Sequence, residues 1–175
     1  KKNDRLDWVM WTDGHKDILL ATKLGKALRF SEGAVRAMGR NAAGVNAIKL
    51  SKLDEIVSTE VLDKEDPRDV LVVSQLGLGK RTAVSEYRCQ GRNTQGVMTL
   101  KITDRNGPVV GVCVVDDDDE VMCISSEGVL IRIPVKNIRQ TGRNAQGVKV
   151  VTPDEGSIVR AVAKVVREAQ ESPEG

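Results

Sequence analysis

Arginines flank glycine and asparagine at three places in this chain, always with the same spacing. The pattern Arg-x-x-Gly-Arg-Asn-x-x-Gly-Val occupies residues 36–45, 88–97 and 139–148. A guanidinium group is always charged, and its N–H donors match the oxygens of a phosphate. Glycine and asparagine tolerate left-handed backbone, so such a loop can turn sharply and let a phosphate approach closely. The spacing therefore predicts three copies of a loop that binds a polyanion.

The basic residues predicted to contact the polyanion keep the same position in each copy. They form three sets: Arg36, Arg88 and Arg139; Arg40, Arg92 and Arg143; and Arg29, Arg81 and Arg132. Lys80, beside Arg81, is a further predicted contact, although it does not recur in the other copies. If the copies lie side by side, equivalent residues form a basic stripe along one edge. A second interpretation is that these arginines brace the fold by pairing with carboxylates of a neighbouring copy. Both roles are compatible if the first arginine of each loop braces and the second reaches outward.

The loops belong to a longer repeat. Their first glycines, Gly39, Gly91 and Gly142, are 52 and 51 residues apart. A second set of glycines that follow apolar runs keeps the same step: Gly25, Gly77 and Gly128. A period near 50 residues is typical of propellers and solenoids.

Each repeat contains four short apolar runs separated by turns. In the second repeat they are residues 70–74, 81–84, 97–102 and 109–115. The runs are rich in Val and Ile, and no apolar stripe of helical length and period occurs. The sequence therefore predicts an all-β fold of four-stranded blades, with glycine at positive φ in a hairpin turn of each blade. The expected blades span about 17–62, 69–115 and 119–166, and residues 167–175 form a polar tail.

The two ends of the chain are out of phase with this repeat. Leu6–Trp11 is predicted to be the last strand of an earlier repeat, and Ile158–Val166 the last strand of the third. Three blades do not close a ring, because propellers typically have about 4 to 8. We therefore expect a piece of a larger protein. The alternative is a three-blade chain that associates with another copy of itself.

Composition restricts the class of partner. The net charge of +2 does not by itself indicate nucleic acid, but basic residues recur in the loops while acids gather at 63–69 and 116–120. The only aromatic residues are Trp8, Trp11, Phe30 and Tyr87. So few rings argue against a protein that stacks the bases of single strands. No apolar run is long enough to span a membrane.

No residue pattern indicates catalysis, a metal or a cofactor in this chain. The single histidine, His15, lies in a polar turn and can build no catalytic constellation. Asp116–Asp119 is expected to be a solvated hairpin turn rather than a metal site. Gly77–Lys80 has the wrong spacing for a phosphate-binding P-loop and leads into a strand. Cys113 and Cys123 lie in apolar runs and are expected to be buried thiols, which is consistent with a cytoplasmic protein.

The triple Gly-Arg-Asn-x-x-Gly-Val repeat, with the stretches 21–30 and 79–88, resembles the C-terminal domain of DNA gyrase A. The resemblance extends from about Leu6 to Val166. It implies a partial β-pinwheel over residues 1–166, a propeller-like disc whose blades exchange strands and whose basic rim wraps double-stranded DNA. It also implies a non-catalytic part of a bacterial, ATP-hydrolysing type II topoisomerase that introduces negative supercoils. The other implied partners are the rest of gyrase A and gyrase B.

The chain departs from the family pattern in two ways. The family's disc usually has five or six blades, whereas this chain carries about three and resembles the C-terminal half. The family's supercoiling box, Gln-Arg-Arg-Gly-Gly-Lys-Gly, is matched only at Gln90, Arg92 and Gly96, so the complete box is expected upstream of Lys1. The C-terminal domain of topoisomerase IV, in which the box is degenerate, is therefore an alternative. A protein-binding propeller scaffold is another, although the chain lacks the Trp-Asp signature of such repeats.

Overall fold

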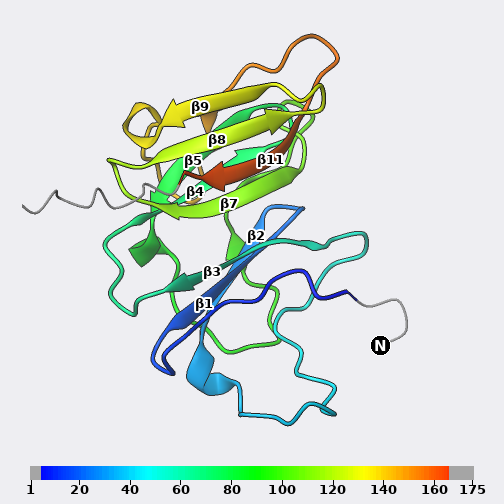
Figure 1. Ribbon diagram of the computed structural model, residues 1–175, viewed down its shortest axis with the longest axis vertical. Helices are drawn as coiled ribbons and strands as arrows, with labels where there is room; N and C mark the ends of the chain where they lie inside the picture. The colour runs from blue at the N-terminus through cyan, green and yellow to red at the C-terminus, as the bar shows by residue number, and fades with distance from the viewer. Residues whose placement is uncertain (1–4, 166–175) are drawn as a thin grey trace, which may run out of the picture.

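The computed structural model describes residues 5–165, and this part of the chain consists of β-strands, three single-turn 3₁₀ helices and connecting loops (Figure 1). The prediction of an all-β fold is confirmed. The strands are β1 (Asp17–Thr22), β2 (Lys26–Ser31), β3 (Ile56–Leu62), β4 (Asp69–Ser74), β5 (Leu78–Ala83), β6 (Val97–Met98), β7 (Val109–Val115), β8 (Glu120–Ser125), β9 (Leu130–Pro134), β10 (Val148–Lys149) and β11 (Val159–Lys164). The 3₁₀ helices, which follow β2, β5 and β9, are η1 (Glu32–Ala34), η2 (Val84–Glu86) and η3 (Val135–Asn137).

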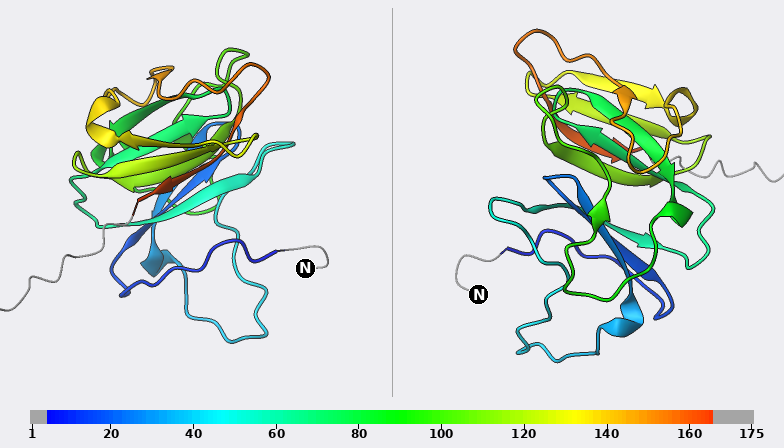
Figure 2. Two further views of the ribbon diagram at one scale, coloured as in Figure 1. Left: turned by 45° about the horizontal axis from the view of Figure 1, so that its top comes forward. Right: turned by 180° about the vertical axis from the view of Figure 1, so that it is seen from behind.

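Strand β4 shows how the apolar runs make the core. It is rich in valine, which suits a pleated surface, and all of its residues are buried. Side chains alternate between the two faces of a strand. Val70 and Val72 therefore pack into a core shared with the first repeat, and Leu71 and Val73 pack into a core shared with the third. The second blade is thus held between the other two (Figure 2).

Neighbouring blades exchange strands, as the pinwheel resemblance implies. The sheets have the orders β3-β1-β2-β6, β10-β5-β4-β7 and β11-β8-β9. Strand β6 belongs to the second repeat but pairs with β2, and β10 belongs to the third repeat but pairs with β5. The fourth strand of the first and second sheets is therefore donated by the next repeat.

This exchange corrects the predicted strand over residues 97–102. Only Val97–Met98 is a strand, and it lies in the sheet of the preceding repeat. The following residues leave the strand because the N–H groups of Thr99 and Leu100 both donate to the Gly25 carbonyl oxygen, at 2.9 and 3.2 Å. The side chains of Thr99 and Leu100 are buried in this arrangement.

The sheets have a common inner edge and a common outer edge. Strands β3, β7 and β11 each lie at one side of their sheet, and β7 contacts both of the others (Figure 1). We call this side the inner edge. The opposite side, formed by β2, β5, β9 and the donated strands, is the outer edge.

A glycine lies in the hairpin turn of each blade, and positive φ is confirmed at all three predicted positions. The φ angles of Gly25, Gly77 and Gly128 are 79°, 80° and 80°. At Gly77 a Cβ atom would also lie 2.1 Å from the carbonyl oxygen of Val151, which comes from the donated segment of the next repeat. Glycine is therefore required there both for backbone conformation and for close approach.

The predicted strand at Leu6–Trp11 is wrong. Residues 5–13 have no regular secondary structure, and Leu6, Val9 and Trp11 are largely exposed. A strand needs a hydrogen-bonded neighbour. The last strand of a repeat pairs with the first strand of its own blade, as β7 pairs with β4, and residues 5–165 contain no earlier blade that could supply that neighbour.

The acidic residues at 116–119 form a turn, as predicted, but the turn is not a hairpin. It joins β7, which pairs with β4, to β8, which pairs with β9 and β11. It therefore connects two blades. The predicted last strand is present as β11, whereas Val166 and the predicted tail at 167–175 lie outside the described residues. In residues 5–165 we find no helix with the length and apolar character needed to cross a membrane.

Candidate nucleic-acid interface

The arginine loop of the second repeat lies along the outer edge of the first sheet. The backbone of Cys89 forms a parallel β-bridge with Arg29, and Val97 pairs with Ala27 on the same strand, β2. The segment between these contacts therefore follows the outside of that strand. Figure 2 shows this loop (green) beside the loop that follows η1 (light blue to cyan).

The arginine loop of the third repeat has the same arrangement on the second sheet. The backbone of Gln140 forms a parallel β-bridge with Arg81, and Val148 pairs with Gly79 on β5. The approach is close, because a Cβ atom at Gly147, where φ is 84°, would lie 2.7 Å from the Gly79 carbonyl oxygen. The repeat therefore places equivalent loops at equivalent positions on the outer edge.

The first arginine of each loop faces solvent. Arg36, Arg88 and Arg139 are all exposed. Their guanidinium groups make no hydrogen bond or ion pair with any residue in the described range 5–165. Each blade therefore presents at least one unpaired positive charge on its loop.

The second arginine of the later loops braces the preceding repeat. Arg92 donates from Nε to the Ala34 carbonyl oxygen and from Nη1 to that of Asn46, both at 3.0 Å. Arg143 donates from Nη1 to the carbonyl oxygen of Met98, also at 3.0 Å. Asn46 and Met98 occupy the same position in their repeats. The expected division of roles is thus reversed, since the second arginine braces and the first reaches outward.

Arg40 is the corresponding second arginine of the first loop. It is exposed and has no partner within residues 5–165, which contain no complete repeat before it. It therefore remains a candidate for contact with a polyanion, unlike Arg92 and Arg143, whose hydrogen bonds hold them against protein.

The hairpin arginine of the first repeat is a structural residue. Arg29 is buried and pairs with Asp17 across the β1–β2 hairpin, with 2.8 Å between Nε and Oδ2. Its Nη1 also donates to the carbonyl oxygens of Val84 and Tyr87 in the second repeat, both at 3.4 Å. Because these protein groups hold the side chain, Arg29 is not included in the contact set proposed below.

The second repeat has the same contacts. Arg81 pairs with Asp69 across its hairpin, with 3.4 Å between Nη1 and Oδ2, and also with Asp117. Its Nε donates to the carbonyl oxygen of Ile138 at 2.6 Å. Ile138 has the position in the third repeat that Tyr87 has in the second. The bracing interpretation therefore holds for Arg81 as well.

Arg132 is the exposed member of this set. It pairs with Glu120 across the β8–β9 hairpin, yet its side chain is 56% exposed, compared with 12% for Arg81. No described repeat follows the third blade to cover it.

Lys80 is buried and contacts the loop of the third repeat. Its Nζ donates to the carbonyl oxygen of Gly142 at 2.8 Å and to that of Arg143. Burial lowers the pKa of Lys80 to about 8, with Glu86 acting against this shift and Arg143 adding to it. Lys80 thus supports the loop from inside and is not included in the contact set proposed below.

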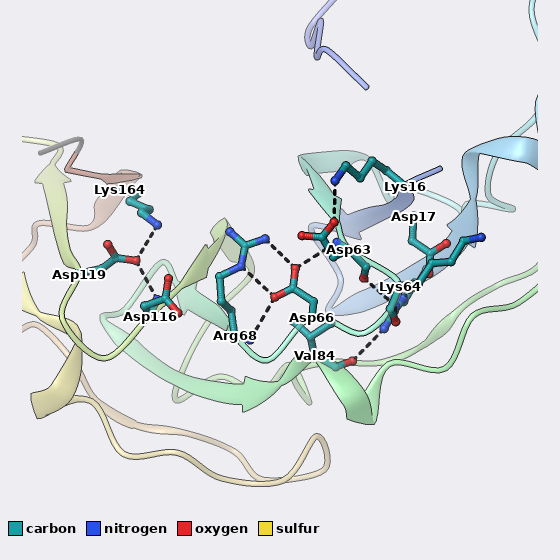
Figure 3. A network of polar contacts seen from close by, with 11 residues as sticks. Lys16, Asp17, Asp63, Lys64, Asp66, Arg68, Val84, Asp116, Asp119 and Lys164 are labelled. Atoms are coloured by element: carbon teal, nitrogen blue, oxygen red, sulfur yellow. Dashed lines mark hydrogen bonds and ion pairs between the residues drawn. The ribbon is translucent and has the colours of Figure 1, made fainter. Parts of the chain in front are cut away.

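Acidic residues are concentrated in the turns that connect the blades (Figure 3). Arg68 binds both carboxylate oxygens of Asp66, at 2.8 and 2.6 Å, and Lys16 binds Asp63 at 2.6 Å. In the next connection the ammonium group of Lys164 lies 2.6 Å from Asp119. These acids fix the turns themselves and hold them to residues of the adjoining blade. In residues 5–165 no group of His, Cys, Asp and Glu is arranged to hold a metal ion.

The prediction from sequence missed two exposed lysines on the outer edge. Lys49 and Lys101 follow the segments that run along this edge, and both are exposed. They lie 52 residues apart, at the same position in successive repeats. That spacing could have identified both lysines from the sequence, although the third repeat has Thr152 at this position.

The chain matches the family described as DNA gyrase C-terminal domain, beta-propeller, over residues 16–63, 68–116 and 119–165. A curated relative, the DNA gyrase A protein of Staphylococcus epidermidis, is 44% identical over 168 residues, which is 96% of this chain and 19% of the relative. The chain thus spans about a fifth of the length of that relative.

Two solved structures share the fold. The C-terminal domain of DNA topoisomerase IV superposes with a TM-score of 0.82 at 30% identity, covering 88% of this chain and 48% of the other. The C-terminal domain of DNA gyrase A gives a TM-score of 0.78 at 28% identity, covering 87% and 51%. Both likenesses fit the three-blade arrangement with exchanged strands.

Proposed function

The chain belongs to the DNA gyrase C-terminal domain family, and from this premise we propose that it binds duplex DNA without sequence preference, bends it and wraps it along the outer edge. The observation that supports this most is the unpaired, exposed first arginine of each loop, repeated in every blade. These residues are Arg36, Arg88 and Arg139. The proposed contact set adds Arg40 and the exposed Lys49 and Lys101.

The mechanism is electrostatic. Arginine and lysine side chains on the outer edge neutralise phosphates and release condensed counterions. Contacts to phosphates fix the position of the duplex but carry no sequence information. Bending a site of 20–30 base pairs by 40–90° costs on the order of 1–6 kcal/mol, which several such contacts can offset. The stacking of blades sets the curvature that the DNA follows.

In the longer protein the domain serves a type II topoisomerase without supplying catalytic residues. Wrapping presents one DNA segment to another with a fixed sign of crossing, which supports ATP-dependent negative supercoiling. The proposed partners are double-stranded DNA, the remainder of gyrase A and gyrase B, and the proposed location is the cytoplasm.

The C-terminal domain of topoisomerase IV is the second candidate, favoured by the TM-score of 0.82. The two parents differ in outcome. The full-length protein, assembled with its ATPase partner and supplied with ATP, should introduce negative supercoils into relaxed plasmid if the parent is a gyrase. Decatenation without supercoiling would favour topoisomerase IV.

Binding to linear duplex over a range of salt concentrations tests the proposal, with the full-length protein as the sample. We expect log Kd to rise linearly with log salt concentration. Replacing Arg88 by alanine should weaken binding to all sequences alike and reduce the slope by about 0.9, the value for one phosphate contact. The matched control is Arg160→Ala, which removes an exposed arginine from β11 at the inner edge. Equal effects of the two variants, or strong preference for one sequence, would contradict the proposal.

A further inference from the structure

Leu53 has a backbone conformation that bulky residues avoid. Its φ is 66°, in the left-handed region. It occupies the third position of a turn that is closed by a 3.1 Å hydrogen bond from the N–H of Asp54 to the carbonyl oxygen of Ser51. Glycine is the usual residue at such a position, and a branched side chain there is an outlier. Outliers of this kind persist where a function requires them.

The third repeat contains the same turn with glycine in that place. Gly156 has a φ of 79°, and the N–H of Ser157 donates to the Asp154 carbonyl oxygen at 2.8 Å. The fold therefore accepts glycine here, and the first repeat carries leucine at a conformational cost. The packing of the turn does not explain the leucine, since its side chain is 87% exposed.

Leu53 lies between lysines on one side and acids on the other. Lys49 and Lys52 precede it, and both are exposed and make no ion pair within residues 5–165. The two acids that follow it are held within the first blade, since Asp54 accepts a hydrogen bond from the Leu24 N–H at 2.9 Å and Glu55 lies 2.8 Å from Lys23 Nζ. The free charges beside Leu53 are therefore the two lysines.

The segment before this turn lies on the outer edge. The N–H of Lys49 donates to the carbonyl oxygen of Thr94, in the arginine loop of the second repeat, at 2.8 Å. Ile48 also forms a bridge with Thr94. Leu53 therefore projects from a segment that is joined directly to the proposed DNA-binding loop.

We propose that Leu53 is an apolar contact that enters the minor groove of the bound duplex, beside phosphates that Lys49 and Lys52 neutralise. This inference rests on the DNA binding proposed above. The minor groove is lined by sugar rings between two rows of phosphates, which matches an apolar tip flanked by lysines. Apolar side chains that enter this groove help proteins to bend DNA. Leu53 accordingly holds the bend at the first blade.

The substitution Leu53→Gly tests this role because it keeps the turn and removes the conformational strain of a branched residue at positive φ. In the full-length protein the variant should have an unchanged or higher melting temperature. The Kd for linear duplex should nevertheless rise about tenfold, equivalent to about 1.4 kcal/mol. The slope of log Kd against log salt should stay the same, because no phosphate contact is lost. The bend angle measured by fluorescence energy transfer between the duplex ends should decrease.

Two further variants complete the test. Lys52→Ala should lower the salt slope by about 0.9, which separates loss of charge from loss of the apolar contact. Ile124→Ala removes another exposed aliphatic side chain, from β8 in the middle of the third sheet, and should leave Kd and bend angle unchanged. An unaltered Kd and bend angle in the Leu53→Gly variant would overturn the inference. Weakened self-association or weakened assembly with other protein chains, seen by sedimentation with DNA binding intact, would overturn it in favour of a protein partner. Absence of DNA binding in the unmodified protein would instead refute the proposed function.

Discussion

Arg81 and Ile138 join the second blade to the third through a 2.6 Å hydrogen bond from Nε to the carbonyl oxygen. The same side chain pairs with Asp69 in its own hairpin. One guanidinium group therefore fixes the hairpin of one blade and the backbone of the next. Arg29 makes the equivalent pair of contacts one repeat earlier, with Asp17 and Tyr87.

Replacing Arg81 by alanine should destabilise the fold strongly. The change leaves the buried Asp69 without its charged partner, although the Gln140 amide still donates to it at 2.8 Å, and removes the donor to Ile138. We therefore expect the free energy of unfolding to fall by about 3 kcal/mol. Arg132→Ala is the matched control at the same position of the third repeat, where the side chain is 56% exposed. It should cost less than about 1 kcal/mol. Urea denaturation measures both values, and similar losses would show that the interblade contact contributes little.

Alanine at Gly77 and at Gly128 should have different costs although both residues have a φ of 80°. At Gly128 nothing lies within 4 Å of the new Cβ, so only the backbone cost of about 1–2 kcal/mol applies. At Gly77 the Cβ meets the Val151 carbonyl oxygen, and overpacking should add about 1–3 kcal/mol. Melting temperatures of the two variants compare these costs directly. If they were equal, close approach of the donated segment would not be important for stability.

Glu60 should make stability depend on pH between about 4.5 and 7. Burial at the inner edge raises the pKa of this carboxyl group to about 7, against the opposing charges of Arg68 and Lys164 and a hydrogen bond from the Val114 N–H. Between these pH values the folded state binds a proton that the unfolded state has lost. The stabilisation is therefore complete below about pH 4.5 and is lost as pH rises through 7.

The substitution Glu60→Gln should remove this dependence. The glutamine cannot ionise, so at pH 8 the variant should be more stable than the unmodified protein by about 1–2 kcal/mol, a range reduced for partial exposure. At pH 4.5 the two should be nearly equal. Urea denaturation at both pH values gives the comparison, and a constant difference across the range would argue against titration of Glu60.

The three cysteines should react at very different rates. Burial raises the pKa of the Cys113 thiol to about 12 and that of Cys123 to about 11, so neither forms a thiolate near neutral pH. Cys89 is exposed on the arginine loop of the second repeat. One equivalent of a chromogenic disulfide reagent should therefore be consumed rapidly at pH 8, and all three only in denaturant. Cys89→Ser should abolish the rapid phase. Rapid reaction of a second thiol in native protein would show that the core opens.

The sequence predicted the fold well because its signals are local. Valine-rich runs and the glycines at 25, 77 and 128 each specify a strand or a turn without reference to distant residues. Leu6–Trp11 has the same apolar character, yet it is not a strand, since a strand also needs a partner with free hydrogen-bonding groups. Which blade receives Val97 and Val148 is likewise decided by contacts between repeats. The resemblance to a strand-exchanged family implied this, and the pattern of one repeat did not.

The candidate site was predicted less well, because position in a repeat does not distinguish an exposed arginine from a buried one. Arg29 and Arg81 carry the same charge as Arg36 and Arg88 and recur just as regularly. Only the structure shows that Asp17 and Asp69 stand opposite the first two across their hairpins. The sequence did contain a pattern that indicates these ion pairs, since each arginine follows its acid by the same 12 residues.

Strand donation also bears on how such chains change in length during evolution. The contacts between the first and second blades recur between the second and third, from Arg29 and Tyr87 to Arg81 and Ile138. Every junction is thus of one kind. A duplication or deletion of one whole period in the gene recreates that junction wherever the breakpoints fall within the repeat. A change of any other length leaves a donated strand without its acceptor. Recombination between repeats can therefore alter the length of the outer edge, and with it the proposed DNA path, in whole steps while each remaining interface stays intact.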